Sequence, residues 1–140
     1  MSQFTQDSTF PCSLSHIPCL GFGTATLKGP SAVEKIENAI SEGYRMLDTA
    51  LLYGNQKEVG QAVKNSGVIR KKIWITTKVS FFPIGNDCLW MYNANNLVGD
   101  ELSSIELSLQ LLDMTYVDLC LLHNPWCVYK SVLYYLVLIH

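Results

Sequence analysis

Four residues whose side chains can hold or transfer a proton are spaced so that they could act together. Asp48, Lys78 and His123 each end a stretch with the composition of a β-strand, and Tyr53 follows shortly after Asp48. A phenol has a pKa of about 10, and a nearby ammonium eases the release of its proton. A carboxylate would keep the lysine charged, and a histidine can donate a hydrogen bond to a substrate oxygen. The set therefore fits proton donation to a carbonyl group that is being reduced by a hydride donor.

Taken one at a time, these residues have ordinary structural explanations. An Asp after a strand often belongs to a turn, a Lys at a strand end is usually a solvated charge, and a lone His is more often structural. The segment Gly21-Phe-Gly-Thr24 lacks the G-x-G-x-x-G pattern of many dinucleotide sites. The four residues are informative as a group only if their strands are parallel neighbours, because the carboxyl ends of such strands meet at one edge of the sheet.

The elements that would position these residues alternate between strands and helices. Four stretches have the apolar, β-branched or aromatic composition of strands: 17–23, 45–48, 72–79 and 116–122. Between them, apolar residues at helical spacing predict helices that begin near Ser31, Asn55 and Asp100. This alternation predicts β-α-β units in an α/β fold, with a parallel sheet that is covered on both faces.

Local signals indicate where the helices begin, end and bury their side chains. Ser31-Ala-Val-Glu34 fits a capping box, and the side chain of Asn55 could cap the second helix. Gly43 and Gly67 are placed to end the first two helices. In the third helix, four apolar residues are expected to form one buried side: Leu102, Ile105, Leu109 and Leu112.

The composition indicates one folded domain and argues against several kinds of partner. The 140 residues are 49% hydrophobic and 16% charged, which is typical of a globular chain with its own core. A net charge of −2 and the lack of a basic run argue against nucleic acid and membrane surfaces as partners. Residues 1–10 carry no apolar region of the kind found in secretory signals, so we expect a cytoplasmic location.

The cysteines and histidines do not indicate a metal site. Five cysteines occur without a C-x-x-C pair, and the three histidines are scattered along the chain. Zinc sites need such side chains in clusters. We therefore expect reduced thiols and no metal ion.

Two stretches do not fit the alternation of strands and helices. Residues 81–99 read as a long loop, and loops of that length are uncommon in compact domains unless they are functional or disordered. Residues 127–140 contain the uncharged apolar run 132–139, which is far shorter than the roughly 20 residues that a helix needs to cross a bilayer.

Several segments resemble, in the same order, the sequence motifs of the aldo-keto reductase family. They are Gly21-Phe-Gly-Thr24, Gly43-Tyr-Arg-Met-Leu-Asp48-Thr-Ala-Leu-Leu-Tyr53-Gly-Asn55, Ile73-Trp-Ile-Thr-Thr-Lys78-Val79, and Ser108-Leu-Gln-Leu-Leu112 with Tyr116-Val-Asp-Leu-Cys-Leu-Leu-His123-Asn-Pro125. The resemblance runs from about Ile17 to Pro125. It implies a (β/α)8 barrel of the TIM type and the NADPH-dependent reduction of aldehydes and ketones to alcohols.

The resemblance also implies a role for each of the four residues. Tyr53 would be the proton donor, and Lys78 would ease proton release from it, with Asp48 as the partner of Lys78. His123 would bind and orient the carbonyl of a small-molecule substrate. The hydride would come from the nicotinamide, and no metal is implied because the tyrosine assists the carbonyl.

The cofactor side of the implied site involves the end of the first strand. Gly23, Thr24 and Asp48 would lie near the nicotinamide ribose of NADPH. The chain departs from the family in the stretch between Lys78 and Ser108, which is about a dozen residues longer than usual. Ser80 also stands where an aromatic residue commonly follows the lysine, so the pocket wall should differ from that of relatives.

The extent of the resemblance predicts only about the first four β/α units of the barrel. Residues 1–126 would form the N-terminal half of an NADP-dependent oxidoreductase barrel, and residues 127–140 would be a hydrophobic tail foreign to the family. An open half-barrel exposes strand edges, which predicts possible self-association. The alternative function is a catalytically inactive truncated isoform or fragment that acts as an interaction or regulatory protein. A flavodoxin-like fold also fits the length but does not account for the motifs.

Overall fold

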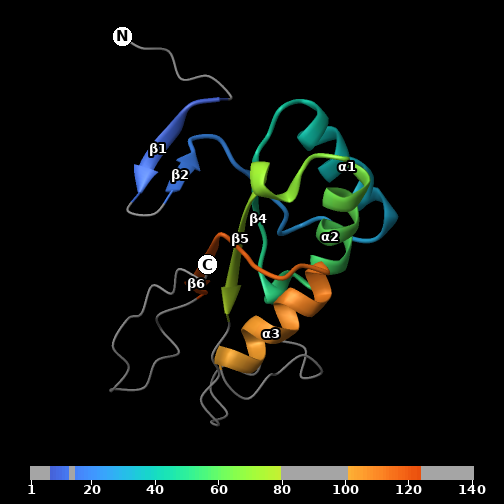
Figure 1. Cartoon of the computed structure of the whole chain (residues 1–140). Coiled ribbons are helices and arrows are strands. Elements are labelled where there is room, and N and C mark those ends of the chain that lie inside the picture. Colours follow the sequence, from blue (N-terminus) through green and yellow to red (C-terminus); the bar gives the residue numbers. More distant parts are fainter. Residues whose placement is uncertain (1–6, 13–14, 80–100, 124–140) are drawn as a thin grey trace.

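The computed structural model describes residues 7–12, 15–79 and 101–123, and a parallel sheet forms its centre (Figure 1). The four strands of this sheet lie side by side in sequence order: β3 (Phe22–Gly23), β4 (Met46–Asp48), β5 (Trp74–Val79) and β6 (Leu119–Leu122). A helix lies between each strand and the next along the chain: α1 (Pro30–Ser41), α2 (Gln56–Asn65) and α3 (Glu101–Leu112). Sequential order is that of a β/α barrel, whereas a flavodoxin-like sheet would place its first two strands out of order.

A two-stranded antiparallel hairpin precedes the sheet and was not predicted. It consists of β1 (Thr9–Cys12) and β2 (Ser15–Pro18). The prediction of one strand over 17–23 is therefore wrong in part, because Ile17 belongs to the hairpin and only Phe22 and Gly23 join the parallel sheet. The amide of Cys19 still donates to the carbonyl of Ser8 beyond the last strand pair, and the chain bends there before it enters β3.

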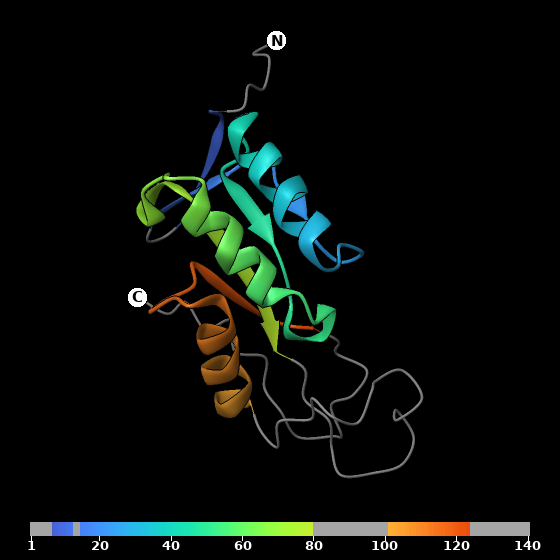
Figure 2. The same ribbon diagram turned by 90° about the vertical axis from the view of Figure 1, so that its right-hand side faces the viewer.

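The helices cover one face of the sheet, and Figure 2 shows them in front of the strands. Alternate strand residues point to this face, where Leu47, Ile75 and Cys120 are buried in one core. The helices contribute apolar side chains to the same core: Ile36, Ile40, Val59, Ala62, Val63 and Leu112. The expectation of a sheet covered on both faces is not met by the described helices. The other face carries Asp48 and Lys78, which lie on neighbouring strands.

The helix ends agree with the sequence in position but not in capping chemistry. Helix α1 begins at Pro30 after Gly29, so the predicted capping box at Ser31 is wrong; the Ser31 hydroxyl instead donates to the carbonyl of Lys28. Proline suits the first helical turn because its missing amide hydrogen is not needed there. The glycines predicted to end α1 and α2 follow those helices with φ of 99° at Gly43 and 67° at Gly67.

Helix α3 confirms the predicted position but not all of its buried side. Leu112 is buried and both Ile105 and Leu109 pack against the core, whereas Leu102 is 74% exposed. Leu102 belongs to the first turn, which lies by the tip of β5 where that strand ends (Figure 1). The described helices are all too short or too polar to cross a bilayer.

Two predicted stretches fall outside the described residues. These are the long loop over 81–99 and the apolar tail over 127–140. The division of the chain at residue 126 therefore stays a prediction.

Candidate active site

The carboxyl ends of the strands bring together all four residues singled out from the sequence. The Nζ atom of Lys78 donates to the carboxylate of Asp48, at 2.7 Å from Oδ1 and 2.8 Å from Oδ2. The same Nζ lies 3.1 Å from the hydroxyl oxygen of Tyr53. The rings of Tyr53 and His123 meet edge to face, with centroids 5.6 Å apart. These residues form one cluster at the end of the sheet where the α/β architecture predicts a site.

Strand register explains why the carboxylate meets the ammonium. Asp48 at the end of β4 pairs with Thr76 of β5, and Lys78 lies two positions further on the same face of β5. The lysine side chain can therefore reach back over the shorter strand. It is only 15% exposed, so its charge depends on protein partners more than on water.

A tight turn after β4 presents the tyrosine to the lysine. Residues Leu51–Tyr53 form a 3-10 helix, η1, which ends at Gly54 in the left-handed conformation with φ of 62°. The backbone amide of Tyr53 donates to the carbonyl of Ala50 across this turn. Glycine permits the left-handed conformation without steric cost, and the turn folds Tyr53 back over the end of the sheet.

Four acceptor atoms lie within hydrogen-bond distance of the Lys78 ammonium. Besides Asp48 and the Tyr53 hydroxyl, it donates to the backbone carbonyl of Thr49 at 3.1 Å. We call Asp48, Thr49, Tyr53 and Lys78 the Lys78 network. A cation held between a carboxylate and a phenol favours the charged form of the lysine and stabilises negative charge on the phenol oxygen.

His123 lies beside this network, in surroundings that favour its neutral form. Its backbone amide donates to the carbonyl of Val79 and so continues the pairing of β5 with β6. Burial lowers the pKa of His123, the positive charge of Lys78 lowers it further, and Asp48 opposes the shift. Its Nδ1 atom is buried and has no hydrogen-bond partner among the described residues. A neutral imidazole retains one N–H that can donate to a ligand.

Gly23 and Thr24 border the carboxylate from the neighbouring strand. Gly23 pairs with Asp48, and a Cβ atom added to Gly23 would meet no other atom within 4 Å, so the space above it is open. Both the backbone amide and the hydroxyl of the buried Thr24 donate to the backbone carbonyl of Asp48, each at 3.0 Å. Gly23 therefore borders open space, and the buried Thr24 holds the chain next to the Lys78 network; we call these two residues the shelf.

The sequence reading missed the role of Asn55 in building this end of the sheet. Asn55 does precede α2, as predicted, but its side chain makes no cap hydrogen bond. Its amide nitrogen instead donates to the carbonyls of Thr24 and Leu27, at 2.6 and 3.0 Å. Only its place between a turn and a helix was visible in the sequence, and that signal indicates a cap.

The described residues show no alternative centre built on a metal. Within the described ranges, no three His, Cys, Asp or Glu side chains lie close enough together to hold an ion. Cys19 and Cys120 are free thiols, and burial raises the pKa of the Cys120 thiol. Cys120 faces the helices, on the opposite side of the sheet from Lys78.

Comparison with known proteins agrees with the motifs and the topology. A family model described as the Aldo/keto reductase family matches residues 19–136. The chain belongs to the aldo-keto reductase family. It is 40% identical over 110 residues to a methylglyoxal reductase, DkgB, of Salmonella typhi, which covers 78% of this chain and 36% of the relative. It is 38% identical over 122 residues to a glycerol 2-dehydrogenase (NADP(+)) of Saccharomyces cerevisiae, which covers 85% of this chain and 35% of that one.

Solved structures identify the fold of this aldo-keto reductase chain. A crystal structure of an aldo/keto reductase from Brucella melitensis superposes with a TM-score of 0.61 at 36% identity. The match covers 77% of this chain and 38% of the other. The described sheet and helices are thus part of a (β/α)8 barrel of the TIM type, and the chain spans just over a third of the length of these relatives.

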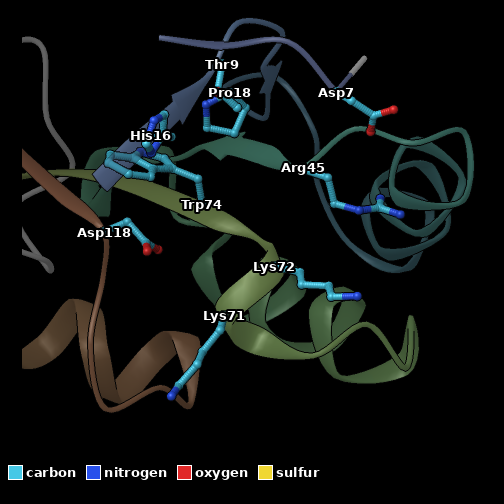
Figure 3. A pocket seen from close by; sticks show the side chains of 9 residues that line it. All are labelled: Asp7, Thr9, His16, Pro18, Arg45, Lys71, Lys72, Trp74 and Asp118. Atoms are coloured by element: carbon cyan, nitrogen blue, oxygen red, sulfur yellow. The ribbon is translucent and has the colours of Figure 1, made fainter. Parts of the chain in front are cut away.

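A pocket of about 250 Å³ lies at the opposite end of the sheet from the Lys78 network (Figure 3). Its walls come from the hairpin and the amino ends of the strands: Asp7, Thr9, His16, Pro18, Arg45, Lys71, Lys72, Trp74 and Asp118. Figure 3 shows that the side chains of Arg45 and Lys72 extend to the same side, away from Trp74, and that Lys71 points elsewhere. The candidate active site of this aldo-keto reductase chain is the cluster at the carboxyl end, where Lys78 contacts both Asp48 and Tyr53.

Proposed function

We propose that this chain carries the proton-donating centre of an NADPH-dependent oxidoreductase that reduces aldehydes and ketones to alcohols. The observation that carries the proposal is the position of the Lys78 ammonium, 3.1 Å from the Tyr53 hydroxyl and within 2.8 Å of both carboxylate oxygens of Asp48. A buried cation held in this way assists a phenol in giving up its proton. Membership of the aldo-keto reductase family supports the same reaction class.

Tyr53 is the proton donor in this proposal. Its hydroxyl gives a proton to the carbonyl oxygen, and Lys78 stabilises the phenolate that forms. Asp48 holds Lys78 charged and fixed in direction, because both carboxylate oxygens accept from the same Nζ atom. The carbonyl oxygen becomes the hydroxyl oxygen of the alcohol, and the phenolate regains its proton from water before the next turnover.

His123 orients the substrate carbonyl. Its ring lies edge to face with Tyr53, so a carbonyl oxygen that accepts from Tyr53 is also within range of the imidazole. The lowered pKa keeps this ring neutral at pH 7, which leaves an N–H to donate without adding a second cation beside Lys78.

The residues on the shelf fit the nicotinamide end of the cofactor. The open space above Gly23 leaves room for a flat ring or a ribose beside Asp48. Gly23, Thr24 and Asp48 are the residues that would hold this end. When bound, the reduced nicotinamide supplies the hydride that the carbonyl carbon receives.

The names of relatives suggest small carbonyl compounds as substrates. The bacterial relative is named a methylglyoxal reductase, and the yeast relative is named an NADP(+)-dependent glycerol dehydrogenase. Methylglyoxal is therefore a suitable first substrate. Because this chain spans 36% of the methylglyoxal reductase, the activity of the whole protein, its substrate and its cofactor are all parts of the proposal.

A titration with NADPH, followed by an activity assay, tests the proposal. Binding of NADPH to the purified chain is followed by tryptophan fluorescence, and turnover of methylglyoxal is followed by the loss of NADPH absorbance. We expect saturable binding, turnover in the wild type, and loss of turnover in Tyr53→Phe. Tyr44→Phe is the matched control, because Tyr44 packs against Phe22 outside the Lys78 network. A folded chain without NADPH binding would contradict the proposal and favour the interaction or regulatory alternative.

A further inference from the structure

The side-chain amide of Asn55 joins the loop that follows β3 to the stretch between β4 and α2, at the carboxyl end of the sheet. We propose that Asn55 is a positioning residue, which ties the loop that follows β3 to the Lys78 network and so sets the spacing between the cofactor side and the proton-donating side of the site. This inference rests on the proposed function for the meaning of those two sides. It assigns to Asn55 a task that its position in the sequence does not suggest.

The contacts of Asn55 are made by a fully buried side chain. It is 0% exposed, and its Nδ2 atom donates to the carbonyls of Thr24 and Leu27, which lie 31 and 28 positions earlier in the chain. Its Oδ1 atom accepts from the hydroxyl of Thr49 at 3.4 Å. A buried amide with these partners cannot shift without leaving polar groups unpaired, which fixes the relative positions of the segments.

Two of the three partners of Asn55, Thr24 and Thr49, directly contact the charged residues of the Lys78 network. Thr24 donates twice to the carbonyl of Asp48, and the carbonyl of Thr49 accepts from Lys78. A displacement of Asn55 would therefore move the shelf at Thr24 relative to the ammonium of Lys78. Among the described residues, no other side-chain amide makes hydrogen bonds both to the shelf and to the Lys78 network.

A second tie runs between the same two parts of the site. The Nζ atom of Lys28 donates to the backbone carbonyl of Tyr53, so the loop of residues 24–28 is attached to the tyrosine turn as well. A Cβ atom at Gly54 would lie 3.5 Å from the Lys28 Nζ atom, an ordinary contact distance, so glycine is favoured there by its φ of 62° and not by lack of space. Lys28 is exposed and its tie can open to solvent, whereas the Asn55 tie is buried.

The capping position of Asn55 does not explain these contacts. An asparagine that caps a helix uses its side-chain oxygen to accept from the amides of the first turn. The side chain of Asn55 makes no such bond, and both of its donated bonds go to distant carbonyls. The side chain of Asn55 therefore holds the loop after β3 in place and does not cap α2.

Asn55→Asp tests the inference, because it keeps the shape of the side chain and removes both donated bonds. The control is Asn65→Asp, the same change at the exposed end of α2, where the amide pairs with Glu37. Two quantities are measured at a temperature where circular dichroism shows each variant folded: the NADPH dissociation constant and the hydrogen exchange rate of the Thr24 amide. In Asn55→Asp we expect roughly tenfold weaker binding and faster exchange, as the loss of buried donors predicts.

Asn55→Ser provides a neutral second variant in case the aspartate prevents folding. Its side chain is too short to reach both carbonyls, so the same two changes are expected. If the Thr24 amide exchanges at the wild-type rate in the folded variants, Asn55 does not hold the loop after β3 in place. Faster exchange with wild-type NADPH affinity would overturn the positioning role, since a purely structural residue would give that result. A wild-type chain that binds no NADPH would defeat the proposed function, and the exchange measurement would still decide the tie.

Discussion

The ammonium of Lys78 donates to both carboxylate oxygens of Asp48, at 2.7 and 2.8 Å, across two neighbouring parallel strands. This paired contact fixes the direction of the lysine, and the Thr49 carbonyl and the Tyr53 hydroxyl also lie within hydrogen-bond distance of the same Nζ atom. The lysine is therefore not a solvated charge at a strand end. Its geometry makes the phenol of Tyr53 the group on which the cation acts.

Replacing Lys78 by Met should abolish turnover and preserve the fold. Met has a similar length but no charge, so the phenolate of Tyr53 would lose its stabilising partner and proton donation would slow. We expect kcat to fall by at least about 100-fold, the lower range for loss of general acid catalysis. Steady-state turnover of methylglyoxal with saturating NADPH measures the effect.

Lys72→Met is the control for this change, because Lys72 lies at the amino end of β5 and is exposed. It should retain wild-type turnover. The turnover of Asp48→Asn should lie between those of Lys78→Met and Lys72→Met. Its side-chain amide can still accept a hydrogen bond from Lys78, but it no longer stabilises the positive charge. Turnover in Lys78→Met equal to that of Lys72→Met would rule out the proposed role of Lys78.

The convergence of the four site residues was predictable because it follows from topology. The spacing of Asp48, Lys78 and His123 at the ends of strands requires only that the strands be parallel neighbours, and alternating strands and helices favour that arrangement. The resemblance to the family then implied a role for each residue, and these roles are part of the proposed function. The ends of β4 and β5 were predicted to within about two residues. The prediction for β5 rests on its many β-branched residues.

Features that depend on distant partners were not predictable in the same way. The Asn55 contacts reach back 28 and 31 positions, and Arg70 pairs with Asp118 over 48 positions, so no local pattern reveals them. The hairpin of β1 and β2 was missed because its strands are short, four residues each, and contain prolines. Local sequence patterns thus predicted the helices and strands. The hydrogen-bond partners of the polar side chains depend on tertiary contacts, which those patterns do not reveal.

The lowered pKa of His123 should make the stability of the chain depend on pH. A histidine whose pKa is lower in the folded state than its usual 6.5 takes up protons more readily when unfolded. Its contribution to stability is therefore complete above pH 6.5 and is lost as the pH falls from 6.5 towards the folded-state pKa. Urea unfolding at several pH values between about 7.5 and 5 should show decreasing stability.

His123→Gln should flatten this part of the pH profile, because glutamine does not titrate. His16→Gln is a suitable control, since His16 is exposed in the hairpin. It should leave the slope of the wild type unchanged. A His123→Gln profile that is as steep as that of the wild type would show that other groups cause the pH dependence.

Gly60 of helix α2 lies against Leu112, the last residue of helix α3. A Cβ atom at this position would lie 2.2 Å from the backbone carbonyl oxygen of Leu112, a contact that side-chain rotation cannot relieve. Gly60→Ala should therefore destabilise the chain by about 2 kcal/mol, the usual scale for overpacking, even though alanine favours helix by about 1 kcal/mol. Urea unfolding followed by circular dichroism measures the difference.

Gly23→Ala is the same substitution in open space and separates packing from function. No atom lies within 4 Å of the added Cβ, so its unfolding free energy should stay within about 0.5 kcal/mol of the wild type. NADPH binding should weaken, because the methyl group would occupy the proposed cofactor shelf. Equal stability of Gly60→Ala and the wild type would mean that α3 can move away from α2 without cost.

Arg70 holds the amino ends of β5 and β6 together in a partly buried ion pair. Its Nη2 atom lies 2.7 Å from the Asp118 carboxylate, and the two side chains are 21% and 20% exposed. Asp118 also accepts from the amide of Ile75 at 2.8 Å, and the guanidinium lies 4.1 Å from the centre of the Tyr116 ring. The pair therefore combines charge, hydrogen bonding and stacking at one point.

Arg70→Met should cost more than an equivalent change at an exposed ion pair. It leaves the Asp118 carboxylate short of a partner, which should lower the unfolding free energy by about 2 to 3 kcal/mol. Lys64→Met removes the cation of the exposed pair with Asp113, where the side chains are 72% and 83% exposed, and should cost less than about 0.5 kcal/mol. Urea unfolding of both variants gives the comparison. Equal losses would mean that the Arg70 pair is solvated in solution, and stability would then rest on the apolar core beneath the helices.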